Sequence, residues 1–129
     1  MADPQKQLQI LSDEYQKLET ELQEIVQARE KLEAQQQENK SVQNEFKSLE
    51  TDANIYKLVG PILLKQDKGD AMMAVDGRLD FIEKEITRIE KQIHDIQEKS
   101  EKNKIEIIQL QTQVQQQQQQ QQQVGAATA

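Results

Sequence analysis

Cysteine and tryptophan are absent from this sequence, and only two tyrosines, two phenylalanines and one histidine are present. Without cysteine, neither disulfides nor thiolate metal sites can form, and this fits a reducing compartment such as the cytoplasm. The single histidine, His94, falls outside the helical repeat described below, and one histidine without other soft ligands does not make a metal site. With aromatic residues at 3% of 129, the chain also lacks the bulky side chains that fill a thick core.

Long apolar runs and excess positive charge are missing too. No stretch approaches 18 apolar residues, so we expect no membrane-spanning helix, and the first ten residues do not resemble a signal peptide. The net charge of −7 disfavours nucleic acid as a partner, because binding phosphates needs a positive surface. There is no glycine-rich phosphate loop and no set of side chains for nucleophilic catalysis. We therefore expect neither an enzyme nor a cofactor.

What the sequence does have is a heptad repeat in two blocks, since apolar residues recur at alternating intervals of three and four. The first block lacks proline and glycine and predicts a helix over about 5–52, starting at Asp3-Pro4. The second predicts a helix over about 70–115, with Asp67 or Asp70 as its cap. The first seam comprises Leu8, Leu11, Tyr15, Leu18, Leu22, Ile25, Arg29, Leu32, Gln36, Asn39, Val42, Phe46, Leu49 and Ala53, and the second comprises Met72, Val75, Leu79, Ile82, Ile86, Ile89, Ile93, Ile96, Ser100, Asn103, Ile107, Leu110 and Val114.

Three polar residues of the first seam, Arg29, Gln36 and Asn39, have three interpretations. Their stems lie along the seam with the polar ends in water, or Asn39 fixes the register of the helices, or they form a polar functional site. In the second helix, we expect Met72 and Met73 to fill the core at the base of the helix; the alternative is that they form an adaptable binding surface. Gly77 either permits close packing or is merely tolerated, at a cost of about 1 kcal/mol relative to alanine.

Between the two blocks, the stretch from Ile55 to Lys65 reads as a β-hairpin, with strands at about 54–59 and 62–66 and a turn at Gly60-Pro61. Both faces are mostly apolar, and a lone hairpin with two open edges is marginal in water. We therefore expect hairpins from several subunits to pair into a larger sheet or barrel. The predicted assembly residues are Ile55, Tyr56, Leu58, Val59, Ile62, Leu63 and Leu64; Lys57 and Lys65 are either charges that guard the edge or ordinary solvated lysines.

The short connection predicts that the helices fold back as an antiparallel pair, with Phe46 near Ile82 and Leu8 near Val114. Ser100 and Asn103 would then face about 18–25 and weaken the seam towards the two chain ends. The last segment, 115–129, is a run of nine glutamines followed by Val-Gly-Ala-Ala-Thr-Ala. Low-complexity glutamine is usually disordered, so we expect any helix there to fray and to end by Gly125.

The hairpin residues 55–66, followed by 78–82 and by Glu85-Ile86, resemble a prefoldin subunit of the β class. Residues 31–35 and Glu38-Asn39 are similar to the subunit-six type of eukaryotes. The likeness extends over about 8–110. It implies a single prefoldin domain over 1–129: a mainly α chain in which a long antiparallel two-helix coiled coil is joined by one short β-hairpin that enters an intersubunit β-barrel.

The same resemblance implies a hetero-hexameric co-chaperone of α- and β-class subunits that uses no ATP. Such a complex captures unfolded proteins, notably actin and tubulin, at the free ends of its helices and passes them to the cytosolic group II chaperonin. The candidate client-binding residues at these tips are Leu8, Ile10, Leu11, Ile107, Leu110 and Val114, although all except Ile10 are equally explained as seam residues. The alternative is a coiled-coil tether or scaffold without chaperone activity, which leaves the apolar hairpin unexplained.

Overall fold

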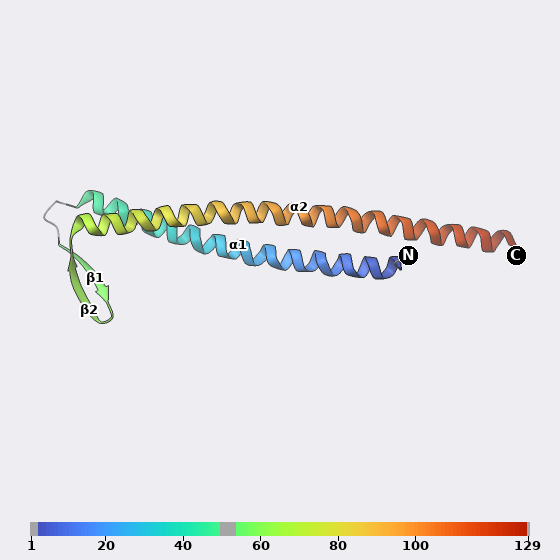
Figure 1. The fold of residues 1–129 in the computed structure, drawn as a ribbon, viewed down its shortest axis with the longest axis horizontal. Helices are drawn as coiled ribbons and strands as arrows, with labels where there is room; N and C mark the ends of the chain where they lie inside the picture. Colours follow the sequence, from blue (N-terminus) through green and yellow to red (C-terminus); the bar gives the residue numbers. More distant parts are fainter. Residues whose placement is uncertain (1–2, 50–53, 129) are drawn as a thin grey trace. The chain divides into compact units, whose positions relative to one another are not determined.

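The computed structural model describes residues 3–49 and 54–128 of the chain, with side chains as far as 122. Along this part of the chain the order is helix, two strands, helix (Figure 1). Helix α1 covers Pro4–Ser48, strand β1 Ile55–Val59, strand β2 Ile62–Gln66 and helix α2 Lys68–Thr128. The prediction of two long helices joined by one short hairpin is confirmed.

Helix α1 begins where the sequence predicts it. The Asp3 carboxylate accepts a hydrogen bond from the Gln5 amide at 3.2 Å, which satisfies one of the free N–H groups of the first turn. Pro4 fills the first helical position, where a missing N–H costs nothing. At the other end the helix stops at Ser48 and Leu49 lies in a bend. The predicted end at 52 and the predicted seam residue Ala53 lie outside the described residues.

The hairpin is a two-stranded antiparallel sheet in which Val59 pairs with Ile62 across a two-residue turn. Gly60 has a φ of 60°, and Pro61 fixes its own φ near −65°. A turn with positive φ only at its first central residue is type II′, and its twist matches that of the flanking strands. The Gly-Pro pair therefore sets the register of the hairpin.

Helix α2 starts two residues earlier than predicted, and Asp67 is the cap. Its carboxylate accepts a hydrogen bond from the Asp70 amide at 3.3 Å, and Asp70 adds negative charge to the first turn, where the helix dipole favours it. At the other end α2 runs through the glutamines and past Gly125 to Thr128. The expectation that Gly125 ends the helix is therefore wrong, because one glycine inside a long helix lowers stability by only about 1 kcal/mol.

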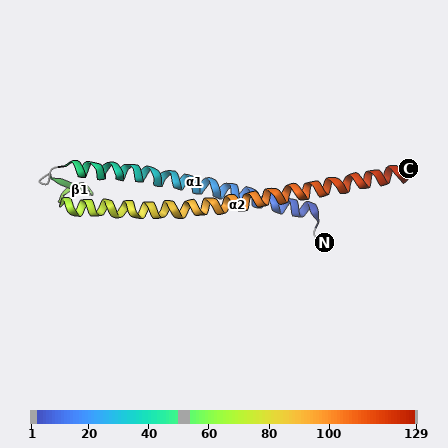
Figure 2. The same cartoon turned by 90° about the horizontal axis from the view of Figure 1, so that it is seen from above.

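The chain divides into two units, and each helix contributes to both. The hairpin unit comprises 27–91, and the terminal unit comprises 1–26 with 92–129. Within the hairpin unit, α1 and α2 lie side by side (Figure 2), and Arg29 reaches Glu90 on the facing helix. Within the terminal unit, the start of α1 lies along α2, which continues beyond it (Figure 1).

The core is a thin seam, as the heptads predict. The most buried apolar side chains of α2 are Ala71, Val75, Ile82 and Ile89, whereas every described seam residue of α1 except the exposed Leu49 is half-buried. Each fully buried valine or isoleucine side chain contributes about 1.5–3 kcal/mol, and the alanine methyl contributes less. The fold therefore depends on many modest contacts along the seam.

The predicted register is wrong within the hairpin unit. Phe46 shares a hollow with Ala71, Ala74 and Val75 and not with Ile82, because α1 ends earlier and α2 begins earlier than expected, which moves the turn. In the terminal unit, Asn103 contacts Glu14. Leu18 and Glu21 line the same hollow as Asn103, so the part of α1 predicted to face this residue lies beside it.

Candidate functional site

The hairpin carries the most prominent apolar surface of the described chain. Six of its seven predicted assembly residues are exposed, with Leu58 the most open at 68%. Tyr56, Leu58, Leu63 and Lys65 share one face, because Leu58 pairs with Leu63 and Tyr56 with Lys65. The other face combines Ile55, Lys57, Val59, Ile62, Leu64 and Gln66. The sheet contains only these two strands among the described residues, so both outer edges are free to pair.

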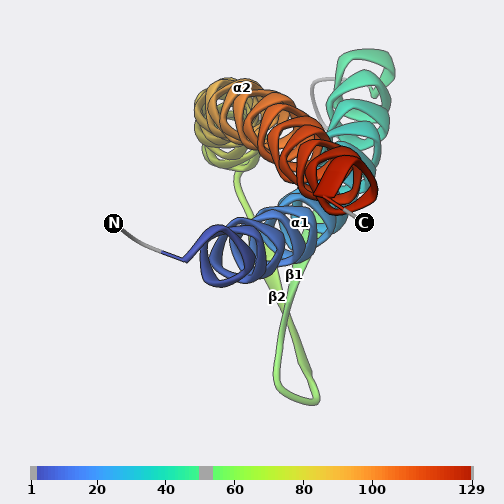
Figure 3. The same ribbon diagram turned by 90° about the vertical axis from the view of Figure 1, so that its right-hand side faces the viewer.

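Ile55 is the exception, because only 9% of its surface is exposed. It lines a hollow at the root of the hairpin together with Phe46, Ala71 and Val75. The structure therefore places Ile55 in the core, where it holds the hairpin to the helices, while the strands project away from the helix pair of their unit (Figure 3). In addition, the Lys68 ammonium donates to the Leu49 carbonyl at 2.8 Å, which satisfies a free acceptor at the end of α1.

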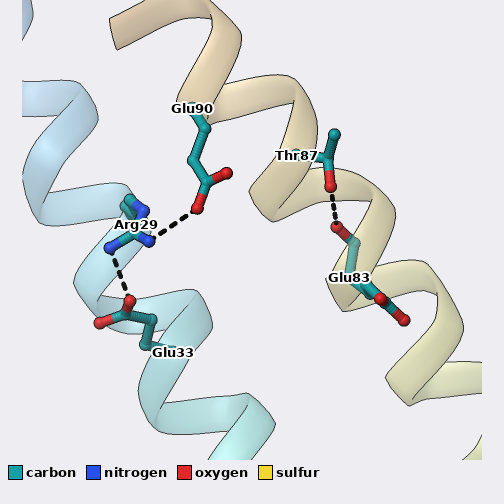
Figure 4. A network of polar contacts seen from close by, with 5 residues as sticks. All are labelled: Arg29, Glu33, Glu83, Thr87 and Glu90. Atoms are coloured by element: carbon teal, nitrogen blue, oxygen red, sulfur yellow. Dashed lines mark hydrogen bonds and ion pairs between the residues drawn. The ribbon is translucent and has the colours of Figure 1, made fainter.

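Polar contacts also join the two helices of the hairpin unit. Arg29 donates from Nη1 to Glu33 Oε1 at 2.6 Å and from Nη2 to Glu90 Oε1 at 2.7 Å, so it links its own helix to α2 (Figure 4). The hydrogen bond to Glu90 raises the pKa of Arg29, with a further contribution from Glu33. Gln43 donates to Asp76 at 2.7 Å. Arg29 thus follows the first interpretation of the polar seam, with its stem along the seam and its charge at the rim.

Asn39 does not fix the register, because its amide donates to the carbonyl of Gln35 in its own helix at 2.7 Å. His94 is exposed and contacts Glu98 of the same helix at 3.0 Å. Neither residue reaches the facing helix through these contacts.

Sequence reasoning missed a second apolar surface on the hairpin unit. Met73 and Phe81 are 74% and 64% exposed, although Met73 was predicted to fill the core; only Met72 is half-buried. Gly77 lies between them, one helical turn from each. The sequence signal was available, since all three positions fall outside the heptad seam and recur at intervals of four.

In the terminal unit, the six predicted client-binding residues separate into two groups. Ile10 is 58% exposed, whereas the other five are half-buried in the seam, namely Leu8, Leu11, Ile107, Leu110 and Val114. Ile105 and Ile108, which were not predicted, are also about half exposed and adjoin each other on α2. Because they lie off the seam, their heptad positions marked them as outward-facing in the sequence.

A polar layer interrupts the seam of the terminal unit at Ser100 and Asn103, which are both buried. Ser100 donates to Glu19 at 3.1 Å and Asn103 Nδ2 donates to Glu14 at 3.4 Å, and Leu18 and Glu21 line the same hollow as Asn103. The facing segment, 14–21, therefore overlaps the predicted 18–25. Asn103 Oδ1 is buried and has no hydrogen-bond partner in the described structure. The layer therefore stabilises the seam less than an apolar layer would.

Over the described residues, neither helix is long and apolar enough to cross a membrane. The same part of the chain contains no group of three or more histidine, aspartate or glutamate side chains placed to hold a metal ion.

Comparison with known proteins gives one consistent result. The family model described as prefoldin subunit matches residues 9–113. The chain belongs to the prefoldin subunit family. Prefoldin subunit 6 of Saccharomyces cerevisiae is 52% identical over 100 residues, which cover 78% of this chain and 88% of the relative. Prefoldin subunit 6 of Homo sapiens is 41% identical over 106 residues and covers 82% of each chain.

The fold of the prefoldin family is shared as well. The crystal structure of the prefoldin beta subunit from Thermococcus strain KS-1 superposes with a TM-score of 0.75 at 26% identity, covering 83% of this chain and 94% of that one. The prefoldin family is a family of chaperone subunits, and its β-type members are the structural relatives of this chain. The interpretation as a prefoldin subunit of the β class is thereby confirmed.

Proposed function

We propose that this chain is one subunit of a hetero-hexameric prefoldin that works in the cytoplasm without ATP. In this proposal the complex captures unfolded proteins such as actin and tubulin and delivers them to the cytosolic group II chaperonin. The observation that supports assembly is the hairpin, which carries six exposed apolar residues on a sheet of two strands. Edges of this kind pair with other strands, so hairpins of α- and β-class subunits would form a shared β-barrel.

Client capture is assigned to the terminal unit. Ile10, Ile105 and Ile108 are each about half exposed there, and single apolar contacts of this size are weak. Several subunits in one complex would contact the same unfolded chain at once, so that avidity compensates for each weak contact. Of the residues predicted from the sequence, Ile10 is the strongest candidate, because the other five already fill the seam.

Assembly is tested with Leu58→Glu and Leu63→Glu, which place two carboxylates on facing positions of one hairpin face. The other prefoldin subunits of Saccharomyces cerevisiae serve as partners, and native mass spectrometry reports the mass of the complex. We expect the double variant to keep its helicity and to remain outside the complex. Ile108→Glu is the matched control, because it adds a charge at a similarly exposed apolar position of the terminal unit, and it should assemble normally.

Client capture is tested on the assembled complex by trimming 1–11 and 107–129 and by the single change Ile10→Ser. Both should reduce the suppression of aggregation of unfolded actin. Full suppression by a trimmed, intact complex would refute the assignment of client binding to the terminal unit. A wild-type chain that forms only its own dimers and joins no prefoldin subunit would instead favour a coiled-coil tether.

A further inference from the structure

Lys57 is a charged side chain in the middle of an otherwise apolar strand. Strand β1 covers Ile55–Val59, so Lys57 is its central residue. On its own face of the sheet, Lys57 pairs with Leu64 across the hairpin and has Ile55 and Val59 as neighbours along the strand. Lys57 is exposed, and it makes no ion pair within the part of the chain that the structure describes. Its ammonium group therefore lies unpaired on a surface that is otherwise suited to burial.

The hairpin also differs in charge from the chain as a whole. Residues 55–66 contain two lysines, Lys57 and Lys65, and no aspartate or glutamate, whereas the net charge of the chain is −7. Lys65 lies one residue from the end of β2, whose central residue is Leu64. A strand that joins the free edge of β1 along its full length therefore has to lie beside a positive charge, whereas the centre of β2 is apolar.

A second copy of this chain is a poor partner for the β1 edge. Two copies of one strand that pair in antiparallel fashion are related by a twofold axis, so each contact occurs twice. When all five residues of β1 pair with the five of the copy, the axis passes through the middle of the strand, and Lys57 lies opposite its own counterpart. Side chains in such positions stand about 4.5–5.5 Å apart, and like charges there destabilise the pair.

A strand with an aspartate or glutamate opposite Lys57 fits the same edge. Opposite charges on directly facing residues stabilise a pair of strands. The effect is larger when the partner also covers this face, because Lys57 then leaves water together with its apolar neighbours Ile55, Val59 and Leu64. An ammonium group that leaves water without an anionic partner is strongly disfavoured.

We propose that Lys57 selects the partner of the β1 edge. It disfavours a second copy of this chain and favours the strand of another prefoldin subunit that carries a carboxylate opposite Lys57. The proposal rests on the proposed function and adds to it the chemistry of the neighbouring strand. Of the two interpretations that the sequence leaves open for Lys57, a charge that guards the edge is thus favoured over an ordinary solvated lysine.

Self-association is tested with Lys57→Gln in the full-length chain, without other subunits. Sedimentation equilibrium should show self-association about two- to fivefold tighter than in the wild type, because the repulsion between facing lysines is removed. Lys65→Gln is the matched control, since it removes the same charge from the same hairpin but away from the centre of its strand, and it should behave as the wild type. Equal self-association of the wild type and Lys57→Gln, including two chains that both stay monomeric, would overturn the proposal, as would an equal increase in both variants.

Partner choice is tested by titration with the other prefoldin subunits of Saccharomyces cerevisiae, followed by native mass spectrometry. Lys57→Glu should join the complex about five- to tenfold more weakly than the wild type, because an attraction becomes a repulsion. Lys57→Arg keeps the charge and should join as well as the wild type. Wild-type affinity of Lys57→Glu would overturn the present proposal alone if Leu58→Glu prevents assembly in the same titration. A wild-type chain that joins no prefoldin subunit would overturn both proposals.

Discussion

Replacing Asn103 by leucine should stabilise the chain, although asparagine makes the only cross-helix hydrogen bond that the structure describes at this position. Asn103 is 7% exposed, and its Oδ1 has no partner among the described residues. A buried acceptor without a partner costs about 1–3 kcal/mol. The bond from Nδ2 to Glu14 is long, at 3.4 Å, so the change loses at most about 1 kcal/mol there.

Burying leucine at this seam position adds about 1.5–3 kcal/mol, and the Glu14 carboxylate is exposed, so it returns to water without penalty. The balance favours Asn103→Leu by about 1.5–5 kcal/mol in the free energy of unfolding. Urea denaturation, followed by circular dichroism at about 222 nm, where helices absorb, measures this change in the free energy of unfolding. The midpoint should rise while the slope stays constant, because the surface exposed on unfolding is nearly the same.

Asn39→Leu is the matched control, since Asn39 is also a seam asparagine but is only half-buried and bonds within its own helix. Its gain should be smaller, below about 1 kcal/mol, because less of the new side chain leaves water. An unchanged or lower midpoint for Asn103→Leu would show that Oδ1 has a partner in solution and that the polar layer stabilises the fold.

Two further predictions concern the seam and its charged rim. Ile89→Ala should lower the free energy of unfolding by about 3 kcal/mol, because Ile89 is buried. Ile108→Ala, at an exposed position, should change it by less than about 0.5 kcal/mol. Equal effects of the two variants in urea denaturation would contradict the described seam. The hydrogen bond from Arg88 lowers the pKa of Glu85. The stabilising contribution of the ionised Glu85 is therefore present above the ordinary glutamate pKa of about 4.3 and is lost as pH falls through the lowered pKa. In an acid titration followed by helicity, the wild type should lose slightly more stability than Glu85→Gln, and identical titrations would contradict this.

The seam was predictable because burial along a helix pair follows the alternation of three and four, which is a local property. Every described seam position except Leu49 is buried or half-buried, as expected. Leu49 is exposed because the helix ends just before it. The hairpin was equally predictable, since Gly60-Pro61 can form only a few turns and the flanking residues favour strands.

The register of the hairpin unit was not predictable, because a heptad repeat fits its partner nearly as well after a shift of seven residues. In the terminal unit the polar layer adds specific contacts, since Ser100 donates to Glu19 and Asn103 donates to Glu14. Nothing in the local sequence assigns these partners. The exposed Met73 and Phe81 were missed for a different reason, because heptad periodicity identifies the side chains that a helix buries and does not identify apolar side chains that stay outside the seam.

The open hairpin has a consequence for the subunit before it finds its partners. Its two free edges and six exposed apolar residues are available to any strand, including those of identical copies. If the subunit assembles through the hairpin as proposed, hetero-assembly and self-association compete for the same surface. The outcome of that competition depends on concentration, since self-association rises steeply with the amount of orphan chain. A cell that makes this subunit in excess over its partners would accumulate aggregates, and balanced synthesis or rapid degradation of the surplus follows as a requirement.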